Sequence, residues 1–469
     1  MATIIAPMRT IPGPRGLPLL GWQINMMKLF VNPYSYMFRL HERYGDIVAL
    51  ARGTTSNVVA FGPALNFRIL SNPDLFITGT GPFIKLSPDS TMGRLMMNNL
   101  GVMNGEKHRQ HRHLMQPAFH KQQILHYCND MIALTQNTLD SWQTKTEIDL
   151  HREMQQLTQR IAVKTLFGVY NEEELNRISV LLRKMIGTIQ FALFIPIDIP
   201  GTPYHHAQRI AEQLSAYLQS LIKQKRQQQD QNDVLAALVH THDEGGAMLS
   251  DDELVGHAFT LFVAGHETTS NSLTWTMFLL NQHPQVAADL LDELDGTLHG
   301  NAPTIEQINK LPLLEGVVKE SLRLLPPASL GIRNTSSECE LGGYELPKGA
   351  NIIYSEFVTH RLPELYEDPH RFKPERWATL DRSPYEYLPF SAGRHMCIGW
   401  SFAMQELKVV LAMLLQCYRL SVVANTKITP NISMRPAHGM PMHVFPQDRQ
   451  FERVAVGGAI HQLIQIPQE

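Results

Sequence analysis

The stretch that decides the fold is Phe390-Ser391-Ala392-Gly393-Arg394-His395-Met396-Cys397-Ile398-Gly399, which stands just before a long apolar segment. That segment is predicted to be a helix, and the glycines keep the preceding loop slim. A thiolate is favoured beside helix N-terminal amides and cations, and Arg394 and His395 are the cations expected to act on Cys397. The pattern favours a metal ligand over a disulfide. The alternative is a buried cysteine that packs as a small hydrophobe.

The same stretch has the form F-x-x-G-x-H-x-C-x-G, which resembles the haem-binding loop of the cytochrome P450 family. The resemblance implies haem b (iron protoporphyrin IX) with the Cys397 thiolate as its axial metal ligand, and with Phe390, Gly393 and His395 around it. In that family, electron donation by the thiolate favours cleavage of the O–O bond. The implied fold is mainly α with small β-sheets: one catalytic domain over residues 1–469, with peripheral ends 1–11 and 447–469 and a long central helix over the haem.

A long helix is predicted from the capping box Ser250-Asp251-Asp252-Glu253 to about Gln282. Such a helix would span roughly 48 Å at about 1.5 Å per residue, so it has to cross the core. Inside it, Ala264-Gly265-His266-Glu267-Thr268-Thr269 resembles the family's A-G-x-[DE]-T-T segment over the distal haem face. The resemblance implies that Ala264 and Gly265 leave room for the haem, and that Thr268 and Glu267 deliver protons. The alternative is a helix bend in which threonine only satisfies a carbonyl.

Glu320 and Arg323 stand three positions apart on a predicted helix, before Pro326-Pro327. They resemble the family's E-x-x-R pair, whose partner is the arginine of a P-E-R segment, here Arg376. The resemblance implies a structural network that supports the cysteine loop. An ordinary surface ion pair is the alternative.

Haem carries two propionates, which require cations. The resemblance assigns this role to His108 and Arg112, four positions apart on a helix that begins near Glu106, and to Arg333 and His395. The same helix carries further basic residues that would suit an acidic electron donor. The alternative is a solvated helix face. These further residues are Lys107, Arg109, His111 and His113.

Apolar residues at positions that line the family's pocket suggest a lipophilic substrate such as a fatty acid, terpenoid or steroid-sized molecule. Core packing would produce the same pattern. The candidates are Phe83, Phe191, Phe259, Phe262, Ala328, Ile332 and Met440.

Composition is consistent with an intracellular enzyme. The chain of 469 residues is 43% hydrophobic, and its net charge of −3 offers no general attraction to nucleic acid. Its four cysteines have no disulfide framework, and no apolar run is long enough for a membrane anchor. The expected location is therefore the cytoplasm.

The resemblance implies a monooxygenase that inserts one atom of dioxygen into a substrate by hydroxylation or epoxidation. No chain length remains for a flavin or nicotinamide domain, so a separate donor is expected, such as a ferredoxin or flavodoxin with its reductase. Two alternatives remain: a haem-thiolate peroxygenase or isomerase that needs no donor, and a haem sensor or binding protein without turnover.

Local patterns predict the remaining elements. The amino-terminal part should hold one helix and a hairpin, the middle should be mostly helical, and strands should return after Pro327. Helices are predicted at 33–44, 121–142, 152–167 and 207–228, and strands at 47–50, 57–61, 344–348 and 351–355.

Overall fold

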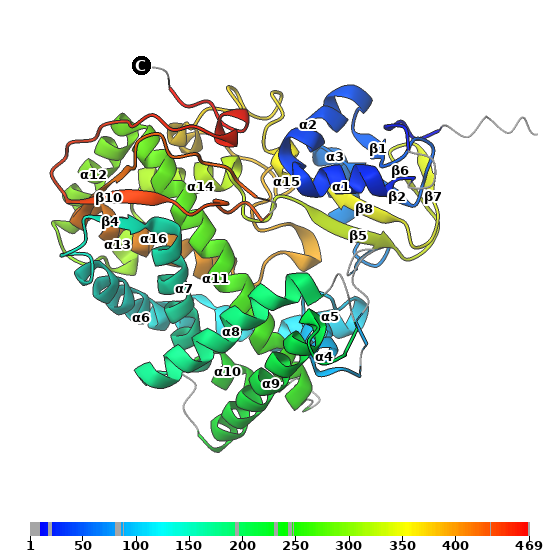
Figure 1. Cartoon of the computed structure of the whole chain (residues 1–469), viewed down its shortest axis with the longest axis horizontal. Helices are drawn as coiled ribbons and strands as arrows, with labels where there is room; N and C mark the ends of the chain where they lie inside the picture. Colours follow the sequence, from blue (N-terminus) through cyan, green and yellow to red (C-terminus); the bar gives the residue numbers. More distant parts are fainter. Residues whose placement is uncertain are drawn as a thin grey trace, which may run out of the picture.

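The structure is a computed structural model that describes residues 10–16, 21–79, 86–87, 89–192, 197–228, 233–242, 246, 248–431 and 433–467. Helices form most of it, and the first strands lie with later ones in a region apart from the main helical body (Figure 1). The α-helices are α1 Gln23–Val31, α2 Pro33–Tyr44, α3 Pro63–Leu70, α4 Thr91–Met97, α5 Gly105–Met115, α6 Lys121–Asp140, α7 Leu150–Phe167, α8 Glu172–Ala192, α9 Pro203–Gln227, α10 Val234–His240, α11 Asp251–Gln282, α12 Pro284–Leu298, α13 Ile305–Ile308, α14 Pro312–Leu324, α15 Glu356–Thr359 and α16 Trp400–Cys417.

The strands form three small sheets. The largest has the order β1-β2-β8-β5-β3, in which β2 and β8 are parallel and the other neighbouring strands are antiparallel. A second sheet has the order β4-β10-β9, and β6 pairs with β7. The strands are β1 Ile47–Ala49, β2 Asn57–Ala60, β3 Phe76–Thr78, β4 Glu147–Asp149, β5 Gly331–Thr335, β6 Cys339–Leu341, β7 Tyr344–Leu346, β8 Asn351–Tyr354, β9 Tyr418–Val422 and β10 Pro441–Pro446. This confirms the mainly α prediction.

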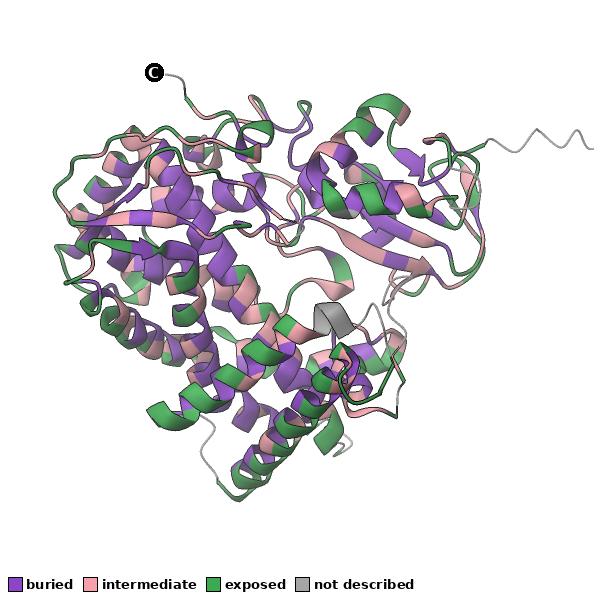
Figure 2. Cartoon of the chain, in the orientation of Figure 1, coloured by how far each residue is buried: buried purple, intermediate pink, exposed green. Residues whose placement is uncertain are grey.

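The long helix α11 forms the centre of the helical body. Ser250 caps it, and the reciprocal hydrogen bonds of the predicted capping box with Glu253 are both present. It packs against α7, α9, α14 and α16, and most of its length is buried (Figure 2). Its 32 residues end at Gln282, before Pro284, as predicted.

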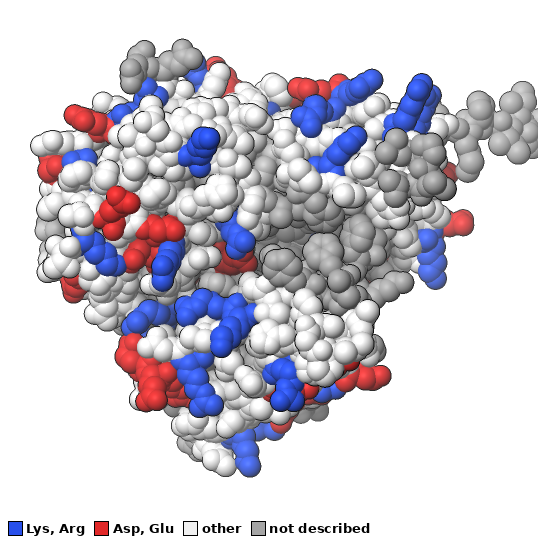
Figure 3. Space-filling view, in the orientation of Figure 1, with Lys and Arg blue, Asp and Glu red and all other residues white. Residues whose placement is uncertain are grey.

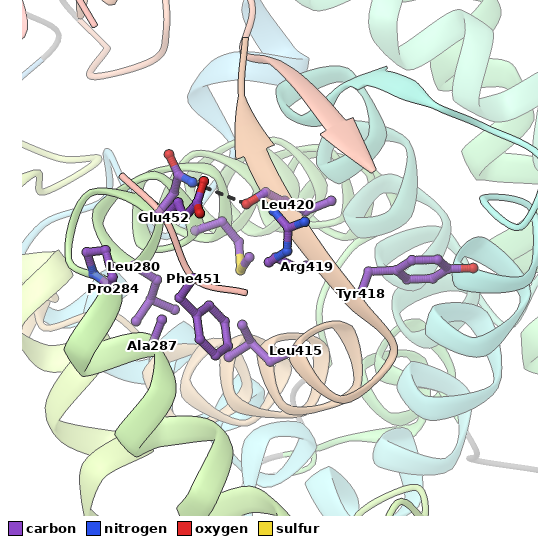
Figure 4. A pocket seen from close by; sticks show the side chains of 11 residues that line it. Leu280, Pro284, Ala287, Leu415, Tyr418, Arg419, Leu420, Phe451 and Glu452 are labelled. Carbon is purple, nitrogen blue, oxygen red and sulfur yellow. Dashed lines mark hydrogen bonds between the residues drawn. The ribbon is translucent and has the colours of Figure 1, made fainter. Parts of the chain in front are cut away.

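The carboxy-terminal segment after β10 packs on the helical body. Arg449 forms ion pairs with Asp292 and Asp295 of α12 at 2.7 and 2.5 Å. Phe451 lines a pocket of only about 20 Å³ with Leu280 of α11 and with residues of α12, α16 and β9 (Figure 4). This segment therefore covers the ends of α11 and α16.

None of the helices in the described residues combines the length and apolar character that crossing a membrane requires.

Candidate active site

The cysteine loop is shaped by one glycine and one backbone hydrogen bond. Cys397 donates its backbone N–H to the carbonyl of Phe390 at 2.9 Å, which closes the loop. Gly393 has φ +70°, and a Cβ there would collide with the carbonyl oxygen of Leu70. Gly399 precedes α16, and its backbone N–H donates a hydrogen bond to the Cys397 side chain. The loop thus presents one thiol at the start of a helix, as predicted.

The Cys397 residue is exposed, yet burial raises the pKa of its thiol. Both observations fit a thiol at the bottom of a hollow, accessible but surrounded by protein. The hydrogen bond from Gly399 and the charge of Arg112 oppose the rise in this pKa. Coordination to a metal deprotonates such a thiol outright, so this site suits an iron ligand.

The prediction that Arg394 and His395 are the cations acting on Cys397 was wrong. Arg394 forms an ion pair with Asp74 at 3.0 Å. Burial and the neighbouring cations together lower the pKa of His395 to about 3, so its ring is neutral at pH 7. The charge that acts on the thiol comes from Arg112 on α5.

The four candidate propionate ligands lie near one another in the structure. The rings of His108 and His395 lie 3.9 Å apart between centroids. Arg112 Nη1 donates to the carbonyl of Met396 at 2.7 Å, which ties α5 to the cysteine loop. Arg333 of β5 lowers the pKa of both histidines, so its charge acts on the same group.

The basic groups of this cluster form no ion pair with an acid among the described residues, although the buried Glu356 lies close enough to interact with the charge of Arg333. Within the described residues, no carboxylate lies within 4.0 Å of a basic nitrogen of His108, Arg112, Arg333 or His395, and the buried Nδ1 of His108 has no hydrogen-bond partner. Burial and the nearby cations lower the pKa of His108 to about 4. A dianionic ligand would supply the missing charge, so the residues present fit the propionates of haem.

On α11, Ala264 and Thr268 are exposed although the helix crosses the core. A Cβ added at Gly265 would meet no atom within 4 Å, so there is open space beside the helix. Thr268 Oγ1 donates to the carbonyl of Ala264 at 2.5 Å. One face of α11 thus provides room for a ligand and presents a hydroxyl to it. The hydrogen bond from Thr268 to a carbonyl of the preceding turn, which the alternative interpretation requires, is also present.

Glu267 points to a different side of α11 from Thr268. It lines a polar pocket of about 650 Å³ between α7, α8, α11 and the loop before β10. Arg435 Nη1 lies 3.9 Å from Glu267 Oε1, and the Arg435 side chain is 37% exposed. Acidic and basic side chains also lie close together across the middle of the face in Figure 3. Glu267 therefore has a connection to solvent that is separate from the Thr268 face.

Glu320, Arg323 and Arg376 form the predicted network. Arg323 donates two hydrogen bonds to the carboxylate of Glu320, at 2.9 and 2.8 Å, and Arg376 Nε donates a third at 3.1 Å. Trp377 Nε1 and the backbone N–H of Lys373 also donate to Glu320, at 3.0 Å each. Glu320 and Arg323 are fully buried. Every formal charge in this network has an opposite charge beside it.

The network also reaches the cysteine loop. Arg323 Nη1 donates to the carbonyl of His360 at 2.8 Å. His360 Nε2 accepts the backbone N–H of Leu388 at 2.8 Å, two residues before Phe390. A continuous set of hydrogen bonds thus connects α14 with the segment that leads into the loop.

The substrate candidates divide into buried and exposed residues. Phe262 is fully buried and stacks on His266 with ring centroids 4.7 Å apart, and Phe259 and Met440 are also buried. Their apolar character serves core packing. Ala328 is exposed before β5, and Ile332 within β5 is half-buried. Phe83 and the side chain of Phe191 lie outside the described residues.

The basic residues of α5 do not form a uniform exposed patch. Lys107 forms an ion pair with Glu253 at 2.9 Å, and Arg109 forms one with Glu106 at 2.9 Å. His111, expected on the surface, is buried against His257 of α11 at 2.9 Å. No local pattern could predict this last contact, because the two histidines are 146 positions apart.

Comparison with known proteins shows the same architecture and family. The family model "Cytochrome P450" matches residues 11–442. Cyclooctat-9-en-7-ol 5-monooxygenase of Streptomyces melanosporofaciens is 34% identical, over 90% of this chain and 92% of the relative. Pentalenene oxygenase of Streptomyces avermitilis is 31% identical, over 89% and 92%. The structure of retinoic acid bound cyanobacterial CYP120A1 matches with a TM-score of 0.80 and 26% identity, over 94% and 100% of the two chains.

Proposed function

The chain belongs to the cytochrome P450 family of haem-thiolate monooxygenases, and we propose that its substrate is a terpenoid hydrocarbon or a molecule of similar lipophilicity. The haem, when bound, activates dioxygen and transfers one of its atoms to the substrate. The proposed metal ligand is Cys397, with His108, Arg112, Arg333 and His395 around the propionates. The observation that carries this assignment is the accessible thiol near Arg112, which belongs to a group of four basic side chains with no ion-paired acid in the described part of the chain.

The proposed substrate class is supported by the exposed residues near the haem site. Ala264 and Ala328 offer only methyl groups, and open space lies beside Gly265. Such surfaces bind by excluding water from apolar area. The names of two relatives add support, because one is called an oxygenase of pentalenene and the other a monooxygenase of cyclooctat-9-en-7-ol.

We assign proton delivery to two residues on different sides of α11. Glu267 Oε1 would take protons from the solvent-connected pocket. Thr268 Oγ1 would release the carbonyl of Ala264 and hold water on the haem side. This complete pair favours oxygen activation with external electrons over a donor-independent peroxygenase or isomerase, and over a sensor without turnover.

A separate ferredoxin or flavodoxin with its reductase would supply the two electrons that each turnover needs. All four cysteines are free, which supports a reducing cytoplasmic location. We further propose that residues 1–469 form one catalytic domain.

The experiment that tests the metal ligand is the absorption spectrum of the purified protein, reduced and exposed to carbon monoxide. Wild type should give the strongly red-shifted Soret band of a thiolate-ligated haem, and Cys397→Ser should lose it. Cys417→Ser, which changes an exposed thiol at the other end of α16, is the matched control and should keep the band. A histidine-type spectrum in all three proteins would overturn the assignment.

The proton-delivery proposal is tested by Thr268→Ala. Haem should stay bound, while product formed per reductant consumed should fall about tenfold or more, because a positioned proton donor contributes at least that much. Thr269→Ala changes a buried threonine on another face of α11 and should leave coupling unchanged. Equal coupling in wild type and Thr268→Ala would contradict the role of Thr268.

A further inference from the structure

Two buried histidines outside the haem site join α5 to the first turns of α11. His111 is 4% exposed and His257 is 1% exposed. His111 Nδ1 lies 2.9 Å from His257 Nε2, and their ring planes are inclined by 54°. The distance is that of a direct hydrogen bond, so exactly one of the two nitrogens carries the shared proton.

The neighbouring bonds determine which nitrogen this is. The backbone N–H of Leu100 donates to His257 Nδ1 at 3.3 Å, so that nitrogen has no proton and His257 is protonated at Nε2. His257 Nε2 therefore donates to His111 Nδ1. His111 then carries its own proton on Nε2, which lies 3.4 Å from Glu253 Oε1. Donation runs in one direction, from Leu100 to Glu253.

Glu253, the last acceptor in this series of hydrogen bonds, is itself held by several partners. Glu253 accepts hydrogen bonds from the backbone N–H and the hydroxyl of Ser250, at 3.1 and 2.9 Å, as part of the capping box. Lys107 of α5 adds an ion pair at 2.9 Å. Burial raises the pKa of Glu253, but these partners outweigh it and lower the pKa to about 2. The acceptor is therefore a carboxylate at pH 7.

This series of hydrogen bonds, from Leu100 to Glu253, leaves neither imidazole able to accept an additional proton. A proton on either ring would set two N–H groups against each other, at Leu100 or between the rings. Burial, together with the neighbouring His111, lowers the pKa of His257 to about 3, and burial also lowers that of His111. The connection between the two helices is consequently made by neutral imidazoles.

We propose that His111 and His257 are positioning residues for the haem: their fixed tautomers hold α5, and with it His108 and Arg112, in place beside the cysteine loop. His111 directly precedes Arg112, whose guanidinium reaches Met396 beside the thiol. His108 lies one turn earlier on α5 and contacts His395. This inference rests on the proposed haem site, and it adds two residues that bond to Leu100, Glu253 and each other and would act on haem through α5.

Two substitutions of His257 in the holoenzyme separate this role from a general effect on stability. An Asn side chain places its oxygen near the position of Nδ1, so His257→Asn keeps the bond from Leu100 and loses the bond to His111. A Gln side chain places its amide N–H near Nε2, so His257→Gln keeps the bond to His111 and loses the bond from Leu100. Each variant loses one buried hydrogen bond, and only the identity of that bond differs.

The readout is the rate of haem transfer to excess apomyoglobin, measured with the haem reduction potential of each variant. His257→Asn should lose haem about tenfold faster than wild type and show a shifted potential, since one lost hydrogen bond weakens the hold on α5. His257→Gln should match wild type in both. Equal rates in the two variants, or faster loss from Gln than from Asn, would overturn the inference. Absence of a thiolate-type haem spectrum in wild type would instead refute the proposed function.

Discussion

Two clusters of ionisable side chains are connected to the cysteine loop, and they differ in how completely their charges are paired. The cluster around Glu320 contains one carboxylate that accepts five hydrogen bonds from side chains and backbone. The cluster around His108 contains four basic side chains and, within the described residues, no ion-paired carboxylate. The carboxylate of the first cluster is paired with protein cations, so that cluster is complete in charge, although Arg376 Nη2 and His360 Nδ1 have no hydrogen-bond partner. The second cluster is incomplete in charge and needs an anionic ligand. A complete buried network thus indicates structure, and an incomplete one indicates a binding site.

The largest expected effect comes from breaking the complete cluster. Glu320→Gln should lower the free energy of unfolding by about 3–5 kcal/mol, because it leaves the fully buried guanidinium of Arg323 and the partly buried one of Arg376 without their counter-charge. Chemical denaturation should show this loss in the haem-free and the haem-bound protein alike. Glu315→Gln, which changes a partly exposed acid on the same helix, is the control and should cost less than about 1 kcal/mol. A loss confined to the haem-bound protein would mean that Glu320 acts on haem.

Removing a cation from the incomplete cluster should have the opposite pattern. Arg333→Gln should leave the unfolding free energy of the haem-free protein unchanged or higher, since it removes one of the two guanidinium charges of this cluster that have no ion-paired acid among the described residues. The holoenzyme should lose haem about 10–100-fold faster, because this ratio of rates corresponds to the free energy of one charge-assisted hydrogen bond. Haem transfer to apomyoglobin measures this rate. Arg394→Gln is the control, because Arg394 already has Asp74 as its partner; an equal effect of both substitutions would contradict the comparison.

The smallest effect is a dependence on pH within the complete cluster. Burial, with Arg323 and Arg361 adding to it, holds the pKa of His360 well below its usual 6.5. The unfolded chain therefore takes up a proton below pH 6.5 that the folded protein does not, so stability from this group falls as the pH falls. His360→Gln can still accept the N–H of Leu388, and its stability should decline less steeply below pH 6.5, by up to about 1.4 kcal/mol per pH unit. Urea denaturation at several pH values measures the slope. His126→Gln, at an exposed site of α6, is the matched control, and an unchanged slope in His360→Gln would be inconsistent with a neutral His360.

The sequence predicted those features whose signals are local or belong to a family motif. The capping box at Ser250 and the helix to Gln282 follow from spacing within one element, and the structure has both. Glu320 and Arg323 share a helix face, and the resemblance to the family motif predicted Arg376 as their partner. The fold class was predicted in the same way, from the family resemblance.

Contacts between distant segments were not predicted. The pairing of His111 with His257, and that of Glu267 with Arg435, depends on how α11 meets α5 and the loop before β10. Apolar residues gave a second kind of error, since Phe262 and Met440 look the same whether they face a substrate or the core. The identity of the cation acting on Cys397 was also missed, because Arg112 lies 285 positions before it in the chain. Strand β4 has only three residues and forms through its pairing with β10, so its own sequence is too short to show the alternation that predicts a strand.

The parallel pairing of β2 with β8 joins segments that are made far apart in time. Asn351 Nδ2 donates to Asn57 Oδ1 at 3.1 Å across this pair, over a separation of 294 positions. A ribosome adding about 5–20 residues per second needs roughly 15–60 s to synthesise the intervening chain. Until then, the buried edge of β2 has no native partner and is open to pairing with other chains. The large sheet consequently cannot be completed until β8 has been synthesised, so its assembly is a late event in the making of the protein.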